Sequence, residues 1–456
     1  MFESDGAGGE SAEAETIAQR QRVLSSATML GAATVLAKLA ALAKDWLVAR
    51  QLGAGDELDA YLVAFLIPSY AVVVLAHSFA SAFVPTYVRV WQRQGLEPAQ
   101  TLASQALAAG IFALVVVTIL LTAVAGYVLP VVGIGFDANK LALTRSLFYP
   151  LAGVVVASGV SAMLAAVLVA HERFAAVALA PVAIPLGTLV VFATFRDRCG
   201  VHALAGGTLV GFAVELCILG LAAWRLGLLP IPRWGRLQGE LRHVGAQYVP
   251  LAFGGLLMSS SLVVDQAMAA SLGSGQVSVL NYGGKIVAVV LGAVAVSLST
   301  VLLPRFSRMI AAGRLDELGR TVRWYARMIV LASIPGVAVL AIFSEPLIRL
   351  LFERGAFTPQ TTVAVSGVQL WLLPQIPFYV LAMLGARVLS ALDGNHVVLR
   401  IGALNLLVNV TGNYVLMRWF GVNGIAMSTS LLYVIAAAAT LWAIRLKLAE
   451  ATAAVR

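Results

Sequence analysis

The sequence predicts an all-α polytopic membrane protein with about twelve transmembrane helices. Of its 456 residues, 60% are hydrophobic and only 12% are charged, and the mean hydropathy is +0.91. Apolar stretches of about 20 residues, long enough to cross roughly 30 Å of hydrocarbon as a helix, recur along the chain. These stretches are continuously apolar, as at 111–129, whereas an outer-membrane barrel has strands of alternating polarity. The composition therefore excludes a barrel and a soluble domain with one anchor.

The twelve predicted spans are separated by short polar loops. Most lysines and arginines outside the spans lie in the even-numbered loops and the tails, which favours cytoplasmic termini in a bacterial inner membrane. Residues 1–22 are polar and lack the apolar core of a signal peptide, so we expect the first span to remain in the mature protein. The spans are expected at 25–49, 58–84, 104–130, 146–170, 174–195, 202–224, 246–271, 278–303, 325–344, 362–388, 398–417 and 422–444.

An internal repeat divides the spans into two pseudo-symmetric six-helix lobes. The segment DWLVARQLGAG from Asp45 aligns with DQAMAASLGSG from Asp265, and VPTYVRVWQRQG aligns later with LPRFSRMIAAGR. Because six spans separate equivalent points, both lobes have the same orientation, which predicts a substrate site between them and alternating access. The expected parts are a cytoplasmic tail (1–24), the N-lobe (25–229), a basic cytoplasmic linker (230–245), the C-lobe (246–445) and a second cytoplasmic tail (446–456).

Lysines inside the predicted spans are candidates for substrate binding, because a charge near the bilayer centre costs about 2.5–3.5 kcal/mol. Lys38 lies too far from either end of its helix to reach the interface, so we expect it to face a wet cavity. Lys285 follows two glycines and is expected to face the same cavity, where both ammonium groups would bind a diphosphate. For Lys44 two interpretations stand, diphosphate binding or a structural role at the interface or paired with Asp59.

Acidic and amide side chains form a second group of candidates. Asp59 opens the second span and is assigned to gating or charge pairing, with Asp45. Asp45 and Asp265 occupy equivalent repeat positions, where they either brace the following loops or act in transport. Asn405, Asn409 and Asn413 form one stripe along the eleventh span, which serves either helix packing or a sodium site with Asp265.

The cytoplasmic segment after the eighth span is rich in arginine, including Arg305, Arg320, Arg323 and Arg327. It either lies on anionic lipid headgroups or only determines topology.

Basic residues are spread over many loops rather than gathered on one soluble face, so we expect no nucleic-acid partner. Motifs for phosphate-binding loops, metalloproteases and nucleophile elbows are missing from the sequence, so we assign no catalytic residue, metal or cofactor. Transport would then be driven by a gradient of Na⁺ or H⁺ or by the membrane potential.

Five segments carry a resemblance to a known family: AKDWLVARQLGAGDELDAYLVAFLIP, SFASAFVPTYVRVWQRQG, LFERGAFT, LNYGGKIVAVVLGAVAVSLSTVLLPRFSR and LNLLVNVTGNYVLM. They resemble the MurJ (MviN) lipid II flippase family. The resemblance implies the fold of the multidrug/oligosaccharidyl-lipid/polysaccharide exporter (MOP) superfamily, a cationic cavity and transport without ATP. Arginines of the family fall on Lys38, Lys44 and Lys285, its acidic position falls on Asp59, and a further arginine falls near Val73.

The resemblance implies a flippase that moves an undecaprenyl-diphosphate-linked precursor of peptidoglycan across the inner membrane. Members usually carry two more carboxy-terminal helices, whereas this chain ends at Arg456, and lysine replaces arginine at three positions. Both differences keep open a flippase for another lipid-linked polysaccharide unit, such as an exopolysaccharide or capsule repeat. Cation-coupled multidrug export and a non-transporting membrane scaffold also stay open. Expected partners are the lipid-linked saccharide and membrane lipids, with glycan-synthesis enzymes as a further candidate.

Overall fold

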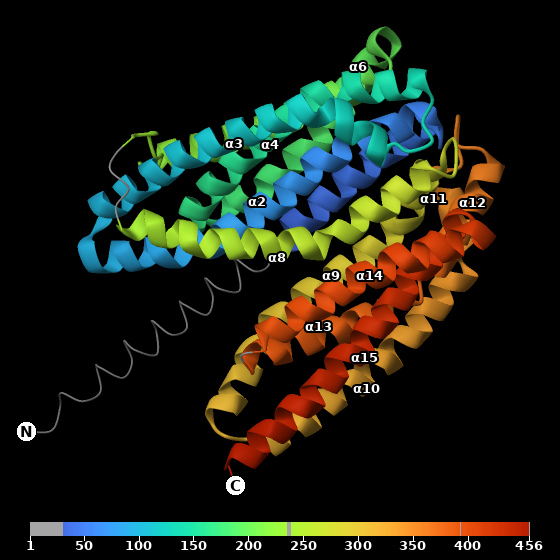
Figure 1. Cartoon of the computed structure of the whole chain (residues 1–456). Helices are drawn as coiled ribbons and strands as arrows, with labels where there is room; N and C mark the ends of the chain where they lie inside the picture. Colours follow the sequence, from blue (N-terminus) through green and yellow to red (C-terminus); the bar gives the residue numbers. More distant parts are fainter. Residues whose placement is uncertain (1–30, 235–238, 393, 456) are drawn as a thin grey trace, which may run out of the picture. The chain divides into compact units, whose positions relative to one another are not determined.

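The computed structural model describes residues 31–234, 239–392 and 394–455, except for the side chains at 75–77, 257–258, 295–304, 311 and 451–455 (Figure 1). Within these ranges the chain forms helices joined by short turns, and no strand. Residues 31–52 are helical. The following helices are α2 (Asp56–Gln94), α3 (Leu96–Val132), α4 (Ala138–Ala170), α5 (Phe174–Leu179), the 3₁₀ turn η1 (Ala180–Val182), α6 (Ala183–Cys199), α7 (His202–Arg225), α8 (Gly239–Ala270), α9 (Gln276–Ala311), α10 (Leu315–Ile342), α11 (Ser344–Phe352), α12 (Pro359–Leu372), α13 (Gln375–Ala391), α14 (Asn395–Phe420) and α15 (Val422–Val455).

Ten helical stretches in the described ranges are long and apolar enough to span a membrane, which confirms the all-α polytopic class. Two further predicted spans, 25–49 and 398–417, correspond to the helix at 31–52 and to α14. Residues 25–30 of the first, like the predicted tail 1–24, lie outside the described residues. Both helices carry polar side chains in their middle, which lowers their hydropathy. These are the lysines and asparagines that the sequence marks as candidates.

Proline shapes the interruptions that the sequence analysis did not predict. The span expected at 174–195 is divided into α5, η1 and α6, with Pro181 in the 3₁₀ turn. The span expected at 362–388 is divided into α12 and α13, and Pro374 lies between them. Proline lacks the N–H that a helix interior needs and its ring clashes with the preceding turn. The short helix α11, with Arg349 paired to two glutamates, lies between predicted spans and was missed.

The described chain divides into two compact units, neither of which is continuous in sequence. The first comprises residues up to Leu47 together with Ala71–Ala123 and Leu147–Ala252. The second comprises Val48–Tyr70, Val124–Ser146 and the chain from Phe253. The second unit therefore contains both the start of α2 and α4 and the whole of α9 to α15. The predicted lobe boundaries, which rest on the repeat, stay a prediction.

An aromatic cluster stabilises the first unit. Phe83 and Tyr87 are fully buried in its core, with ring centroids 5.4 Å apart. The Tyr87 hydroxyl lies 2.9 Å from Nε2 of His171, in the turn between α4 and α5, and the Trp91 ring lies 4.1 Å from the imidazole. Burial, and secondarily the charge of Arg173, lower the pKa of His171 below its usual value. His171 is therefore neutral in the folded state at pH 7.

We expect this histidine to make folding stability depend on pH. Because its pKa is lower in the folded state, the unfolded chain takes up the proton first, so stability is complete above the unfolded pKa near 6.5 and falls as pH drops below it. The thermal unfolding temperature of wild type should decrease from pH 7.5 to pH 5 more steeply than that of His171→Gln. His243→Gln, at an exposed histidine that contacts Gln247, is the control and should follow wild type.

The core of the second unit joins residues from both halves of the sequence. Val63 of α2 and Val132 of α3 pack in one buried cluster with Ala270 of α8, Val277 of α9 and Ile425 of α15. Helices α13, α14 and α15 lie side by side in this unit (Figure 1). The cluster holds the beginning of α2 against the beginning of α9, which is where the first polar site is found.

Candidate functional site

The carboxylate of Asp59 connects three helices of the second unit. Asp59 lies in the first turn of α2 and is fully buried. Its Oδ2 accepts hydrogen bonds from the backbone N–H of Gly275 (2.7 Å) and from Nζ of Lys140 (2.9 Å). Its Oδ1 accepts from the backbone N–H of Ser278 (2.8 Å) and from the Ser278 hydroxyl (2.6 Å). The carboxylate thus caps the amino-terminal end of α9, where free N–H groups and the helix dipole favour a negative charge.

Lys140 supplies the counter-charge. Its Nζ lies 2.9 Å from Asp59 and 2.7 Å from Oδ1 of Asp56, and its side chain is only 7% exposed. The backbone of Lys140 is held in the first turn of α4 because its N–H donates to Oδ1 of Asp137 (2.7 Å), a typical helix cap. Both the lysine and the Asp59 carboxylate are withdrawn from water, so each depends on the other.

Close backbone contacts surround this ion pair. The backbone N–H of Ala356 donates to the carbonyl oxygen of Arg50 at 2.8 Å, so the loop after α11 docks on the end of the helix at 31–52. Gly355 has a φ of +62°, and a side chain there would clash with the Arg50 carbonyl oxygen. Two phenylalanines of the segment LFERGAFT also hold it against α9. The ring centres of Phe352 and Phe357 lie 5.2 Å and 5.3 Å from the ring centre of Tyr282.

Gly355→Ala is expected to lower the free energy of unfolding by at least about 2 kcal/mol. The substitution combines a left-handed backbone conformation, which costs about 1–3 kcal/mol outside glycine, with a steric clash against backbone. Chemical or thermal unfolding in detergent measures the loss. Gly227→Ala is the matched control, because Gly227 also has a positive φ (+67°) but nothing lies within 4 Å of the position of its added carbon. Equal losses in both variants would mean that the contact with Arg50 contributes nothing.

A second polar cluster is centred on Asp265 of α8. Oδ1 of Asp265 accepts hydrogen bonds from Nδ2 of Asn409 (2.8 Å) and of Asn413 (2.7 Å), one turn apart on α14. The Thr429 hydroxyl lies 3.4 Å from Oδ2. Asn409 and Asn413 are fully buried, and their Oδ1 atoms have no hydrogen-bond partner among the described residues. Asn409 and Asn413 of the predicted stripe therefore both contact Asp265, and Thr429 is an additional member of the cluster.

Asn405, the other asparagine predicted for this site, does not donate to Asp265 in the described contacts. It lines a neighbouring cavity of about 510 Å³ with Ser261, Tyr379 and Tyr433, and its Oδ1 is also buried without a hydrogen bond. An amide exchanges donor for acceptor when it turns by half a rotation about its last bond. Turning Asn409 and Asn413 would direct their oxygens toward Asp265, an arrangement that a hard cation would stabilise.

The candidate lysines belong to different units. Lys38 and Lys44 lie in the first unit, where Lys38 is exposed and Nζ of Lys44 forms an ion pair with Oδ1 of Asp45 at 3.0 Å. Within the second unit Asp59 pairs with Lys140, and the pair of Lys44 with Asp59, one of the alternatives left open by the sequence, stays a prediction. Lys285 lies in the second unit, with its Nζ 5.8 Å from the centre of the Tyr282 ring.

Sequence reasoning missed two residues of the Asp59 site. Lys140 is a basic residue in an odd-numbered loop, against the general charge bias, and this exception was the one signal for it. Ser278 lies in the first turn of a helix, three residues after the N-cap Gly275, where backbone N–H groups need an acceptor from outside the helix. Neither signal indicates Asp59 as the partner, because the contact between Ser278 and Asp59 joins residues more than two hundred positions apart.

Comparisons with known proteins agree on a family. A probable lipid II flippase MurJ of Rhizobium meliloti (strain 1021) is 28% identical over 339 residues, covering 72% of this chain and 63% of its own length. One from Vibrio cholerae serotype O1 is 24% identical over 435 residues, covering 91% of this chain and 81% of its own length. The chain thus spans somewhat less than two thirds of the first of these relatives.

Solved structures show the same fold. A lipid II flippase MurJ in an inward closed conformation aligns with a TM-score of 0.78 at 21% identity, covering 93% of this chain and 90% of the other. A multidrug resistance MATE family transporter of the MOP superfamily, in an inward-facing conformation, aligns with a TM-score of 0.77 at 14% identity, covering 91% and 95%. The fold is therefore the MOP fold. Since the family model for lipid II flippase MurJ matches residues 48–454, this multi-pass membrane protein belongs to the lipid II flippase MurJ family.

Proposed function

We propose that this protein is a transporter, not an enzyme, that moves an undecaprenyl-diphosphate-linked cell-wall precursor of the lipid II type across the bacterial inner membrane. The observation that carries the proposal is the family match over residues 48–454, on a fold shared with MOP transporters. The two relatives named above are probable lipid II flippases, a function that implies a lipid-linked saccharide as the substrate. Peptidoglycan synthesis would then be the process that this protein serves.

The diphosphate would be bound by Lys38 and Lys285, with Lys44 assisting. Lys38 is exposed and has no ion pair among the described residues, so its charge is accessible to a ligand. Lys285 lies beside the Tyr282 ring, with its Nζ 5.8 Å from the ring centre, a distance at which the ring face attracts the ammonium group. Lys44 is already paired with Asp45, so its part would be to orient that carboxylate or to exchange partners on binding. Lysine binds phosphate as a point charge, without the bidentate geometry of arginine.

Asp59 would act as a gate between the two predicted lobes. Its carboxylate lies on α2, from the first half of the chain, and caps α9, from the second half. Alternating access requires such a link to form in one state and to break in the other. The proposed topology, with both termini cytoplasmic, places this gate at the periplasmic end. The lobes would be those of the repeat, 25–229 and 246–445, joined by the basic linker at 230–245.

Transport would be coupled to a cation bound at Asp265. The carboxylate and the two buried amides, Asn409 and Asn413, supply oxygen ligands of the kind that hard cations prefer. The unpaired amide oxygens support this assignment, because a buried acceptor without a partner costs about 1–3 kcal/mol. Binding of the cation in the C-lobe would shift the equilibrium between the inward-facing and outward-facing states of the transporter.

Transbilayer movement of lipid II in liposomes tests the proposal. Lys38→Ala and Lys285→Ala should each reduce the rate at least about tenfold, because a hydrogen bond to a charged group contributes about 1.5–3 kcal/mol. Lys447→Ala, which removes a lysine beside Glu450 in α15, is the charge-matched control and should transport normally. Lys38→Arg should retain activity, since arginine keeps the charge and adds bidentate contacts.

Different substrates in the same assay separate the competing functions. Movement of another undecaprenyl-diphosphate glycan but not of lipid II would assign the protein to a different lipid-linked polysaccharide. The lysines that replace family arginines at positions 38, 44 and 285 favour this outcome. Export of cationic drugs without lipid movement would identify a multidrug exporter. No transport of any kind by folded protein under an imposed membrane potential would favour the scaffold role.

A further inference from the structure

A cationic cavity lies at the turn from α9 to α10, within the second unit. It has a volume of about 620 Å³ and is lined by Arg305 from the end of α9 and by Arg320, Arg323 and Arg327 from α10, together with Thr321, Trp324 and Tyr325. The three α10 arginines follow at intervals of three and four residues, so they share one face of the helix. All four arginine side chains are exposed.

These four charges are not neutralised within the part of the chain that the structure describes. The guanidinium of Arg305 donates from Nη1 to the Tyr325 hydroxyl at 3.0 Å, and no carboxylate lies within ion-pairing distance of any of the four in the described ranges. Like charges at such spacings on a helix repel one another. The cavity therefore favours an anion, and several guanidinium groups around one space suit a phosphate group in particular.

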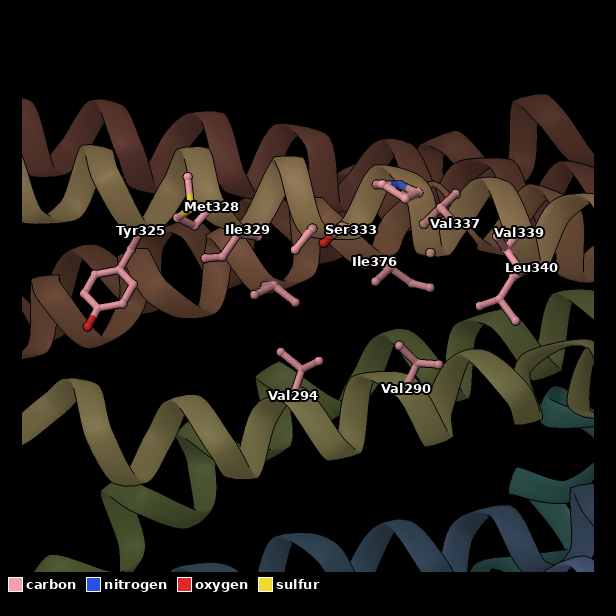
Figure 2. A pocket seen from close by; sticks show the side chains of 14 residues that line it. Val290, Val294, Tyr325, Met328, Ile329, Ser333, Val337, Val339, Leu340 and Ile376 are labelled. Carbon is pink, nitrogen blue, oxygen red and sulfur yellow. The ribbon is translucent and has the colours of Figure 1, made fainter.

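An apolar cavity continues from the cationic one. It has a volume of about 720 Å³ and is lined by Val290 and Val294 of α9, by α10 from Met328 to Leu340, and by Ile376 and Val380 of α13. Tyr325 lines both cavities. Figure 2 shows Tyr325 at one end of the row of α10 side chains and Leu340 at the other, with Val290 and Val294 facing them. Fifteen residues of helix correspond to about 22 Å, more than the roughly 15 Å of hydrocarbon in one leaflet.

Helix α10 packs closely against the protein only near its start, and the apolar cavity lies along the rest of the helix. The helix has 28 residues, but its buried residues are Leu318, Gly319 and Val322, all within its first two turns. Beyond them the helix presents apolar side chains such as Met328 and Leu331 that are exposed. A long apolar cavity bordered by protein on three helices, with a cationic cavity at one end, matches an amphiphile with an anionic head and a hydrocarbon tail.

We propose that this double cavity binds one anionic glycerophospholipid, with its phosphate among the four arginines and one acyl chain along the apolar cavity. Tyr325 lines both parts and Trp324 lines the cationic part, and aromatic side chains of this kind are enriched where membrane proteins meet the headgroup region. A membrane phospholipid is favoured over a soluble anion, because a soluble anion would leave the apolar part empty. The bound lipid completes the packing of α10 against α9 and α13. This site is independent of the proposed transport function.

Native mass spectrometry of the delipidated full chain tests the proposal, using dioleoylphosphatidylglycerol and dioleoylphosphatidylcholine as probes. Wild type should retain one phosphatidylglycerol at a concentration at which phosphatidylcholine is lost. In the triple variant Arg320→Gln, Arg323→Gln, Arg327→Gln, this retention should fall at least about tenfold, since each basic residue near an anionic headgroup contributes to binding. The control variant Arg225→Gln, Arg233→Gln, Arg242→Gln loses the same charge elsewhere and should bind as wild type does.

A second variant tests the tail of the lipid. Gly336 lines the apolar cavity, and no atom lies within 4 Å of the position of an added side-chain carbon, so Gly336→Leu fills the space without a backbone clash. It should weaken dioleoylphosphatidylglycerol at least about threefold while leaving binding of water-soluble glycerol phosphate unchanged. Equal retention of both phospholipids by wild type, or equal losses in the two triple variants, would overturn the proposal. So would a preference of the site for undecaprenyl phosphate over phosphatidylglycerol, which would identify the occupant as a polyprenyl lipid.

Discussion

Asp59→Asn is expected to open the contact between α2 and α9 and to reduce lipid movement at least about a hundredfold. The amide cannot neutralise Lys140, and its NH₂ group would face N–H donors at the start of α9. Removing one partner of a buried ion pair costs about 3–5 kcal/mol, which is comparable to the few kcal/mol that separate two conformations of a protein. The equilibrium should therefore shift toward the state in which this contact is broken.

Cysteine labelling measures this shift. Ala270 is fully buried in the core that joins the two halves, so Ala270→Cys should react slowly with a membrane-impermeant maleimide in the wild-type background and quickly in Asp59→Asn. Cys199 and Cys217 are exposed and must first be replaced by alanine. Asp56→Asn is the matched control. Asp56 pairs with the same lysine but its side chain is 59% exposed, so its loss should have little effect. Slow labelling in Asp59→Asn would contradict the gating role.

The helical architecture was predictable from the sequence because each span carries its own signal. Continuous apolar stretches mark the helices regardless of their neighbours, and each of the twelve predicted spans coincides largely with helix in the residues that the structure describes. The breaks at Pro181 and Pro374 were missed, although proline is visible in the sequence. Transmembrane helices also tolerate proline without a break, as α3 does at Pro130, so the residue alone does not decide.

The polar sites were predictable only in part, because a charge in a span indicates importance without naming its partner. Helical periodicity placed the asparagines on one face of α14 and led to the hypothesis of a sodium site with Asp265, and Asn409 and Asn413 donate to that carboxylate in the structure. For Lys44 the sequence left several roles open, one of them a pair with Asp59, and it gave no indication that Lys140 of α4 is the partner of Asp59. Tertiary contacts of this kind depend on how helices pack, which local pattern does not encode.

Asp265→Asn is expected to abolish any dependence of transport and stability on sodium. A cation held by Asp265, Asn409 and Asn413 binds only the folded protein and would raise its stability by about 2.7 kcal/mol at a hundred times its dissociation constant. The unfolding temperature of wild type should therefore be several degrees higher in sodium chloride than in choline chloride. The variant keeps the hydrogen-bonding shape of the side chain but loses the charge that the cation requires, so the two salts should give the same unfolding temperature.

Two comparisons make the sodium experiment decisive. Asp45→Asn changes the aspartate at the equivalent repeat position, which pairs with Lys44, and it should retain the full response to sodium. Asn405→Ala removes the asparagine that lines the neighbouring cavity, while Asn409 and Asn413 still donate to Asp265, so this variant should also respond. If Asp265→Asn still gained stability in sodium, the cation would bind elsewhere. If wild type itself gave equal temperatures in both salts, the carboxylate and its amides would be a packing element, and the driving force would have to come from the membrane potential or from protons.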